Sequence, residues 1–381
     1  MDTGPTDPGA PVPPAPLGES IAGLTATERN LFVQGRDSFA AVEDAADGLG
    51  PVFNGRSCGE CHTSGALGGA ATNIGVARVT RIGGIEAGKY SDLVNYGGPV
   101  LQARSLREDI PNYPHPGEVI PPQARFVSRR ITTPLFGAGL MEAIPGEAII
   151  ARSRLNLSDG VRGVPNMVVN PLNGRTEVGR FGWKAQHSNL EVFSADAYLN
   201  EMGITTPLDP KENNPQGLPI APGADLVGDP EDQEDVELFA DFMRFLAPPV
   251  PTVVTNITQR GEQIFNQIAC TNCHVPSMRT GQNAVAALSN KAVALYSDLL
   301  LHRMGPQLAD GIVQGNAQGD MFRTAPLWGL GRRRFYLHDG RATTVEAAIL
   351  NHGGEATNAR NRFMNLNPAD KGALRDFLNS L

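Results

Sequence analysis

Two short stretches of the chain carry cysteine and histidine at the spacing that covalent haem attachment requires. They are Cys58-Gly59-Glu60-Cys61-His62 and Cys270-Thr271-Asn272-Cys273-His274. In a c-type site the two thiols form thioethers with the haem vinyl groups, and the adjacent imidazole binds the iron from one face. We therefore predict two covalently bound haem c groups. The attaching residues are Cys58, Cys61, Cys270 and Cys273, and the proximal iron ligands are His62 and His274.

A zinc site and a redox-active cysteine pair are the alternatives for the same residues. Zinc ribbons place their two cysteine pairs about 15 to 20 residues apart, whereas Cys58 and Cys270 are 212 positions apart. The chain has four cysteines, and the two motifs use all of them. Because no thiol is left for another role, the pattern favours haem over zinc or disulfide chemistry.

The second half of the sequence repeats the first around these motifs. Each half has a similar segment before its motif, a Pro-Leu-aromatic-Gly segment after it and an apolar segment at its end. The matching pairs are Gly35–Phe39 with Gly261–Phe265, Arg130–Gly137 with Arg323–Gly329, and Asp241–Leu246 with Asp376–Leu381. Each half therefore reads as one cytochrome c-like helical unit that holds one haem.

Composition and local patterns predict a mainly α fold with long Gly/Pro-rich loops and few strands. Glycine and proline number 43 and 30 of 381 residues, above their usual combined share of ~12%. The capping-box spacing of Thr25–Glu28 predicts a helix start, and apolar residues recur at helical spacing from Phe239 to Leu246. We expect a proline-rich linker over residues 1–18, an N-terminal cytochrome c-like domain over 19–250 and a C-terminal one over 251–381.

Charge and hydropathy limit the partners and the location. The net charge of −8 argues against nucleic acid as a partner, and no apolar run reaches the ~18 residues that a transmembrane segment needs. Covalent haem attachment implies export, so we expect a periplasmic protein. Met1 is followed by Asp2-Thr3-Gly4-Pro5 rather than by an apolar signal segment, and we expect that the signal has been removed. The proline-rich start would also suit the spacer after a lipid anchor, for which the sequence offers no further sign.

The order of the motifs resembles the di-haem c-type oxidoreductase family, first catalogued as a domain of unknown function, within the bacterial cytochrome c peroxidase and MauG superfamily. The resemblance runs from about residue 25 to the end of the chain. Its most specific segments are Leu299–Pro306, Pro326–Gly331 and His338–Ala342. It implies that one haem uses peroxide or dioxygen while the other relays electrons. Many members carry a cysteine pair in the loop that is residues 207–235 here, and this chain has none.

The distal ligands decide what each haem does, because a haem with both axial positions filled transfers electrons and one with an open position binds small molecules. In the superfamily that the chain resembles, the second haem's distal ligand lies about fourteen residues after the histidine of a His-Asp-Gly motif. Counting from His338 leads to His352, although a histidine near a helix end is also favourable through the helix dipole alone. The other histidines are His338 and His302 as rival ligands, and His115 and His187 as surface or loop residues.

The same resemblance assigns roles to two residues near the first haem. No histidine occupies the matching distal position, which favours an open or weakly ligated iron. Glu201 resembles the superfamily's distal acid, and a carboxylate there can shuttle a proton between the oxygens of peroxide. Trp183 resembles the tryptophan between the two haems, an electron relay. The alternatives are a solvated helix-end carboxylate for Glu201 and a packing aromatic for Trp183.

These assignments favour a periplasmic, peroxidase-like di-haem oxidoreductase. Peroxide is reduced at the first haem, electrons are relayed through the second, and a small redox protein donates them. The alternatives are a dioxygen-dependent di-haem oxygenase and a non-enzymatic di-haem electron carrier. Calcium between the domains is left open by the sequence.

Overall fold

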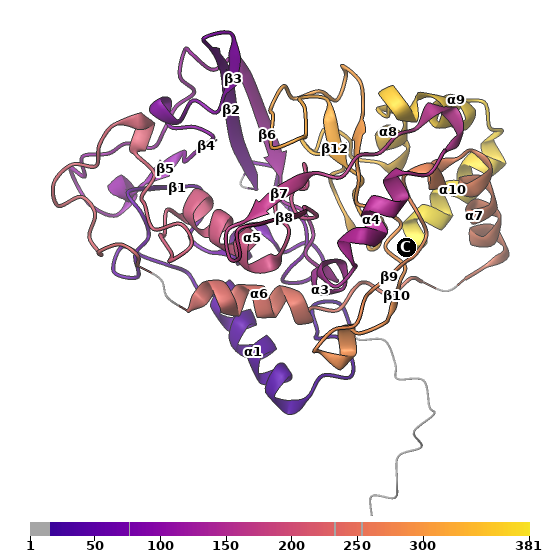
Figure 1. Cartoon of the computed structure of the whole chain (residues 1–381), viewed down its shortest axis with the longest axis horizontal. Coiled ribbons are helices and arrows are strands. Elements are labelled where there is room, and N and C mark those ends of the chain that lie inside the picture. The colour runs from indigo at the N-terminus through magenta and orange to yellow at the C-terminus, as the bar shows by residue number, and fades with distance from the viewer. Residues whose placement is uncertain (1–15, 76, 232–233, 253) are drawn as a thin grey trace, which may run out of the picture.

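The computed structural model describes residues 16–75, 77–231, 234–252 and 254–381. The linker predicted over residues 1–18 falls almost entirely outside this part of the chain. In Figure 1 the first half of the chain, coloured indigo to magenta, lies mostly on one side of the molecule, and the C-terminal helices, coloured yellow, lie on the other. The boundary predicted at residue 250 falls in the connection between α6 and α7, and the division into domains remains a prediction.

Ten α-helices form among the described residues. They are α1 (Ala26–Ala40), α2 (Cys58–Cys61), α3 (Ala138–Glu142), α4 (Gly146–Ser153), α5 (Leu190–Ala197), α6 (Asp235–Phe245), α7 (Asn256–Gln267), α8 (Val345–Leu350), α9 (Thr357–Met364) and α10 (Pro368–Ser380). The strands are β1 (Val52–Phe53), β2 (Arg78–Glu86), β3 (Lys89–Ser91), β4 (Val100–Leu101), β5 (Arg104–Ser105), β6 (Phe126–Ile131), β7 (Met167–Asn170), β8 (Arg175–Val178), β9 (Met278–Arg279), β10 (Ala292–Val293), β11 (Leu301–Arg303) and β12 (Met321–Arg323).

The predicted mainly α fold is confirmed only in part. Helices account for about 33% of the residues and strands for about 14%. The largest sheet has four strands, in which β2 pairs antiparallel with β3, β4 and β6. β2 contains Val79, Thr80 and Ile82, and such β-branched residues favour extended backbone. The other sheets of the described residues are two-stranded ribbons, and long loops join them as the glycine and proline content predicts.

Two helices of the first half, α1 and α6, pack against each other. Thr25 caps α1: its hydroxyl accepts a hydrogen bond from the Glu28 N–H, while the Glu28 carboxylate accepts one from the Thr25 N–H. The predicted capping box is therefore confirmed. α6 packs against α1, and the rings of Phe39 and Phe242 meet at 4.9 Å across this contact.

The second half repeats this helix pair with α7 and α10, and one glycine permits the close crossing in each pair. A Cβ atom at Gly35 in α1 would lie 2.1 Å from the carbonyl oxygen of Leu238 in α6. A Cβ atom at Gly261 in α7 would lie 2.1 Å from the carbonyl oxygen of Ala373 in α10. Because Gly35 and Gly261 occupy matching positions of the sequence repeat, the same backbone contact is built twice.

Gly261→Ala should therefore destabilise the protein by about 1–3 kcal/mol, the usual cost of overpacking a tight contact. The matched control is Gly372→Ala in α10, where the nearest atom to an added Cβ is the Arg375 side chain at 3.8 Å. That change should stabilise by roughly 0.5–1 kcal/mol, because glycine weakens a helix interior relative to alanine. Thermal unfolding followed by circular dichroism measures both. Equal melting temperatures for the two variants would contradict the close crossing.

Buried apolar residues form two main cores. The larger cluster contains Phe53 and Phe242 from the first half, and it also contains Leu295 and Leu300 from beyond residue 250. The smaller cluster gathers residues of α7 and α10, such as Ile264 and Leu374. Among the described residues, no helix combines the length and the apolar character needed to cross a bilayer.

Candidate functional site

The first attachment motif forms a single helical turn that points its histidine at a backbone carbonyl. The Ser57 hydroxyl caps α2 by accepting a hydrogen bond from the Glu60 N–H. His62 follows α2, and its Nδ1 lies 3.1 Å from the Gly69 carbonyl oxygen, a contact typical of metal-ligating histidines. Burial lowers the pKa of His62 to about 4, so the ring is neutral, which is the form that binds iron.

The second motif has the same arrangement on a shorter turn, η6 (Cys270–Asn272). The residue before it, Ala269, has a φ of 67°, a left-handed conformation that is uncommon for alanine. His274 Nδ1 lies 3.0 Å from the Tyr296 carbonyl oxygen. Burial, with a smaller contribution from His352, lowers the pKa of His274 to about 4. Both motifs therefore present a neutral imidazole held by the main chain.

The state of the thiols disfavours zinc and redox exchange. None of the four cysteines forms a disulfide. Burial raises the pKa of Cys61 and of Cys270 to about 12 and raises the pKa of Cys58 and of Cys273 as well. Zinc binding and disulfide exchange need thiolates. A zinc site needs several His, Cys, Asp or Glu ligand atoms close together. Among the described residues, three or more such atoms lie within 4.8 Å of one another in one group only, and that group is made of carboxylates. Neither motif therefore has a zinc ligand set.

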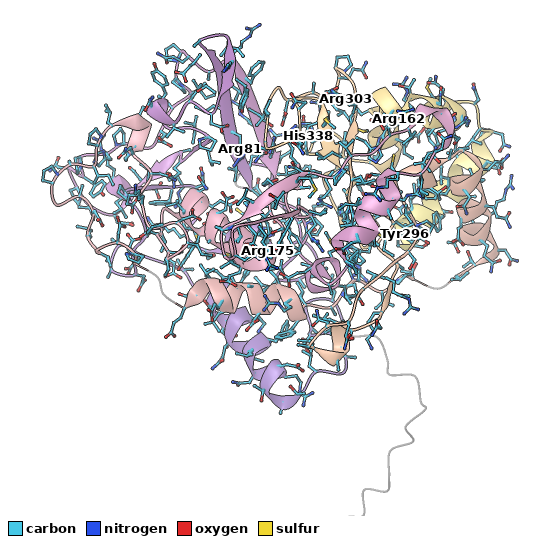
Figure 2. All side chains as sticks on the ribbon, viewed as in Figure 1. Arg81, Arg162, Arg175, Tyr296, Arg303 and His338 are labelled. Carbon is cyan, nitrogen blue, oxygen red and sulfur yellow. The ribbon has the colours of Figure 1, made fainter. Side chains whose placement is uncertain are left out.

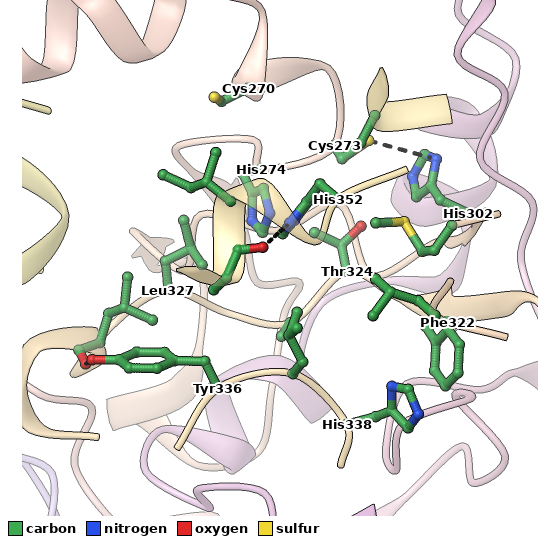
Figure 3. Close-up of a pocket in the computed structure, with 18 of the residues that line it drawn as sticks. Cys270, Cys273, His274, His302, Phe322, Thr324, Leu327, Tyr336, His338 and His352 are labelled. Carbon is green, nitrogen blue, oxygen red and sulfur yellow. Dashed lines mark hydrogen bonds between the residues drawn. The ribbon is translucent and has the colours of Figure 1, made fainter. Parts of the chain in front are cut away.

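The second motif opens onto an apolar cavity that contains another histidine. The cavity has a volume of about 210 Å³, and His274 and His352 both lie in its wall. His352 follows α8, and its Nδ1 lies 2.8 Å from the Ala348 carbonyl oxygen. Figure 3 shows the two imidazole rings in the same part of the pocket. In each ring the Nδ1 contact leaves Nε2 as the nitrogen that can bind a metal.

The two rival histidines near this cavity are engaged differently. His302 Nε2 lies 3.0 Å from Asp298 Oδ2, and its Nδ1 lies 2.9 Å from Glu355 Oε2. Burial opposes the charged form, yet the hydrogen bonds to the carboxylates raise the pKa of His302 well above its ordinary value. A protonated ring with both nitrogens bonded cannot ligate iron. The His338 ring instead stacks on Phe322 at 4.3 Å between ring centres, as Figure 3 shows.

His115 and His187 lie outside the named helices and strands, as the loop interpretation expects, but neither is a surface residue. Both are buried, with 8% and 9% of their surface exposed. His187 lies 3.2 Å from the Asp196 carboxylate, and His115 Nε2 accepts a hydrogen bond from the Ala221 N–H at 2.9 Å. The neighbouring residues in the sequence give no sign of this burial, because the partners of both histidines are brought to them by the fold. Neither histidine lines the cavity at either motif.

The cavity at the first motif brings a carboxyl group to the attachment residues. Glu201 and His62 line it together with the two cysteines of the motif. Glu201 lies in η4 (Tyr198–Met202), a π-helical turn, and such turns are frequent at functional sites. Burial, reinforced by the charge of Asp196, raises the pKa of Glu201 to about 7. The carboxyl group can therefore exchange a proton near neutral pH.

The first cavity offers no second imidazole. Among the described residues that line it, His62 is the one histidine, and Met202 and Met243 contribute thioether groups instead. Helical spacing marks Met243 as a core residue, and nothing in the sequence singles out Met202. The only sign of a possible role is the sulfur atom that each side chain carries, because some haems are ligated by one methionine and one histidine.

Trp183 is close to residues of both motifs. It packs against the same apolar cluster as Cys61, a cluster that includes Ile131, and it lines the cavity of the second motif. Its Nε1 donates a hydrogen bond to the Ile131 carbonyl oxygen at 2.8 Å, and its ring meets His338 edge-on at 6.4 Å. Figure 2 shows His338 in the middle of the molecule, where the two halves of the chain meet.

Comparison with known families decides the class of protein. The family described as "Di-haem oxidoreductase, putative peroxidase" matches residues 123–381. The chain belongs to the di-haem oxidoreductase family. The matched span includes the second motif and His352. It begins after the first motif and well after residue 25, where the resemblance was expected to start.

Solved structures similar to this di-haem oxidoreductase are distant. Hydrazine synthase of Kuenenia stuttgartiensis, pressurised with xenon, is 15% identical with a TM-score of 0.43, and 100% of this chain and 99% of that chain are covered. A MauG-like protein associated with microbial copper homeostasis is 15% identical with a TM-score of 0.40, covering 97% and 93%. The diheme peroxidase BthA of Burkholderia thailandensis E264 is 14% identical with a TM-score of 0.41, covering 92% and 86%. No curated protein matches the sequence.

Membership of the family implies two haem groups, and the residues of both cavities suit them. Each cavity combines the two neutral thiols and the neutral imidazole of its own motif with largely apolar walls. Two thiols and an axial imidazole are the donors that a haem c group requires. The groups at the Cys58–His62 motif and at the Cys270–His274 motif are called the first and the second haem below.

A carboxylate cluster is the one place among the described residues with the ligands that calcium prefers. Glu212, Asp229 and Glu231 bring their oxygens within 4.8 Å of one another. All three precede residue 250, so the cluster belongs to the first half rather than to a junction of the two. Burial, with the charges of the neighbouring carboxylates, raises the pKa of Glu212 to about 9.

Proposed function

We propose that this chain is a periplasmic di-haem c-type peroxidase. The observation that carries the proposal is the contrast between the cavities: the first has Glu201 and no second histidine, and the second has His352 beside His274. A haem iron with an open axial position binds and activates peroxide, whereas one with two strong ligands transfers electrons. Peroxide is therefore reduced at the first haem, and electrons enter through the second.

The residues that hold the two groups follow from this assignment. Cys58 and Cys61 would attach the first haem through thioethers, and His62 would supply an iron ligand. Cys270 and Cys273 would attach the second haem, and His274 and His352 would supply its iron ligands.

Glu201 performs the proton transfer of the reaction. Reduction of hydrogen peroxide consumes two electrons and two protons and yields two water molecules. The Glu201 carboxylate takes the proton from one peroxide oxygen and delivers it to the other, which then departs as water. Its pKa of about 7 suits both halves of this exchange at neutral pH. The aromatic walls of the cavity, which include Phe39 and Phe239, limit the access of bulk water.

Trp183 is the electron relay in this proposal. Its ring touches the cluster around Cys61 on one side and the second cavity on the other. Its bond to the Ile131 carbonyl oxygen fixes the ring in that position. The electron donor is a small redox protein, and the net charge of −8 favours a donor with a positively charged face.

Stopped-flow mixing of the reduced protein with hydrogen peroxide tests the proposal. Both haems should be oxidised in a reaction whose rate rises with peroxide concentration, and the signal of the first haem should change before that of the second. An electron carrier would react slowly at both haems. Reoxidation that is faster with dioxygen than with peroxide would contradict a peroxidase and favour an oxygenase.

Replacing Cys58 and Cys61 together with serine should remove the first haem and leave the spectrum of the second in place. The covalent haem content, measured as the pyridine haemochrome of the denatured protein, should fall from two per chain to one. The matched variant, Cys270→Ser with Cys273→Ser, should lose the other haem. Unchanged haem content in either double variant would contradict covalent attachment at that motif.

A further inference from the structure

Two guanidinium groups in the wall of the second cavity lack an anionic partner. Arg323 and Arg333 both line this cavity. Arg323 donates to the carbonyl oxygens of Gly182 and Thr324 at 3.0 and 3.2 Å. Arg333 donates from Nη2 to the carbonyl oxygens of Pro326 and Trp328 at 2.8 and 3.2 Å. In the described part of the chain, neither side chain forms an ion pair.

The hydrogen-bonding capacity of Arg333 is not used up by these contacts. Its Nε is buried and has no hydrogen-bond partner among the described residues. Burial lowers the pKa of Arg333 to about 10, and burial together with the charge of Arg333 lowers the pKa of Arg323 to about 10. Two like charges in an apolar wall are costly unless an anion compensates them. The two carboxylates in the cavity wall, Asp159 and Glu355, pair with Arg362 and His302 instead, so neither compensates these two charges.

The first half of the chain carries no free counterpart of these two charges: Arg130, which opens the matching segment, pairs with Asp310 and lines neither cavity. Aligning the repeated segments on Pro134 and Pro326 places Ile131 opposite Arg323 and Met141 opposite Arg333. The backbone supports this pairing in three dimensions. The Ile131 N–H donates to the His338 carbonyl oxygen at 2.9 Å, and the Arg323 N–H donates to the Trp183 carbonyl oxygen at 2.9 Å. The two guanidinium groups are thus a property of the second site alone.

We propose that Arg323 and Arg333 bind the propionate groups of the second haem. Haem c carries two carboxylates, and the planar guanidinium fork is suited to carboxylates. The inference rests on the proposed attachment of haem at Cys270 and Cys273. Positive charge beside a haem favours its reduced form, so the pair raises the potential of the second haem and offsets the lowering expected from two imidazole ligands.

Arg333→Gln tests the inference through the midpoint potentials of the two haems, followed in a spectroelectrochemical titration of the holoprotein. The equilibrium constant for reduction of the second haem should fall about tenfold, which corresponds to a midpoint potential lower by ~59 mV for one electron. The potential of the first haem should stay unchanged. Arg333→Lys, which keeps the charge but not the fork, should show a smaller fall. The matched control is Arg334→Gln, which removes the same charge from an exposed neighbour and should change neither potential.

A second measurement needs no substitution and therefore does not depend on how the variants fold. In infrared difference spectra of the unsubstituted protein with carbon-13 in the propionate carboxyl groups, the second haem should show ionised, hydrogen-bonded carboxylates at neutral pH. Equal potentials in Arg333→Gln and Arg334→Gln, or protonated propionic acid bands, would overturn the inference while leaving the peroxidase proposal intact. A haem content of one per chain, with the second motif empty, would instead overturn both.

Discussion

Replacing His352 with alanine is expected to convert the second haem from a low-spin to a high-spin state. The variant removes the imidazole whose Nδ1 is held by the Ala348 carbonyl oxygen, and the side chain of alanine offers no ligand. The iron then keeps His274 alone as a strong axial ligand. Electronic absorption and electron paramagnetic resonance spectra of the oxidised protein should show nearly complete loss of the low-spin signal, with the first haem's signal unchanged.

Two further variants sharpen this test. His352→Met should keep the iron six-coordinate and raise its potential, because Met/His ligation is the pairing that raises haem potentials. His115→Ala removes another buried histidine, one that lies outside both cavities, and should leave both haem spectra as they are. A low-spin signal that survives in His352→Ala would exclude His352 as the ligand and direct attention to His338, the other histidine in the wall of that cavity whose ring is not held by two carboxylates.

Replacing Glu201 with glutamine should slow the reaction with peroxide by about 10²- to 10⁴-fold, the usual contribution of a general acid-base group. Glutamine keeps the size of the side chain but cannot take up and release the proton. The pKa of Glu201 is raised to about 7, so its carboxylate form prevails only above this value. The rate constant of the unsubstituted protein should therefore rise with pH through about 7 and then level off, and the variant should lack this rise.

The control for Glu201→Gln is Glu237→Gln, which removes an exposed carboxylate from α6. Stopped-flow measurements between pH 5 and 9, a range of about two units on either side of the Glu201 pKa, compare the two variants with the parent. Glu237→Gln should retain both the rate and the pH profile. A Glu201→Gln protein that keeps the parent's rate within a factor of about three would contradict the proton-transfer role.

Features that depend on the spacing of nearby residues could be predicted directly from the sequence. The capping box at Thr25 is a contact between residues three apart, and the structure forms both of its hydrogen bonds. The repeat matches Gly35–Phe39 with Gly261–Phe265, and in the structure α7 packs on α10 as α1 packs on α6, with a glycine at each crossing. The family assignment likewise follows from motif order, and the match over residues 123–381 supports it.

Contacts between distant segments are the part that the sequence could not supply. Asp298, four residues before His302, is a local partner, but the sequence gives no sign of the second carboxylate, because Glu355 lies 53 residues away. The four-stranded sheet forms because β6 pairs with β2, although a long Gly/Pro-rich segment separates the two strands in the sequence. The charges of Arg323 and Arg333 gain meaning only when both are found in one cavity. Each of these features is created by packing rather than by periodicity.

Quantitative electron paramagnetic resonance of the fully oxidised protein tests the central claim of two unlike haems most directly. The account predicts one high-spin and one low-spin ferric signal in equal amounts, each accounting for one iron per chain. The high-spin signal belongs to the haem beside Glu201, and the low-spin signal belongs to the haem between His274 and His352. Two low-spin signals, or a single iron per chain, would contradict the account.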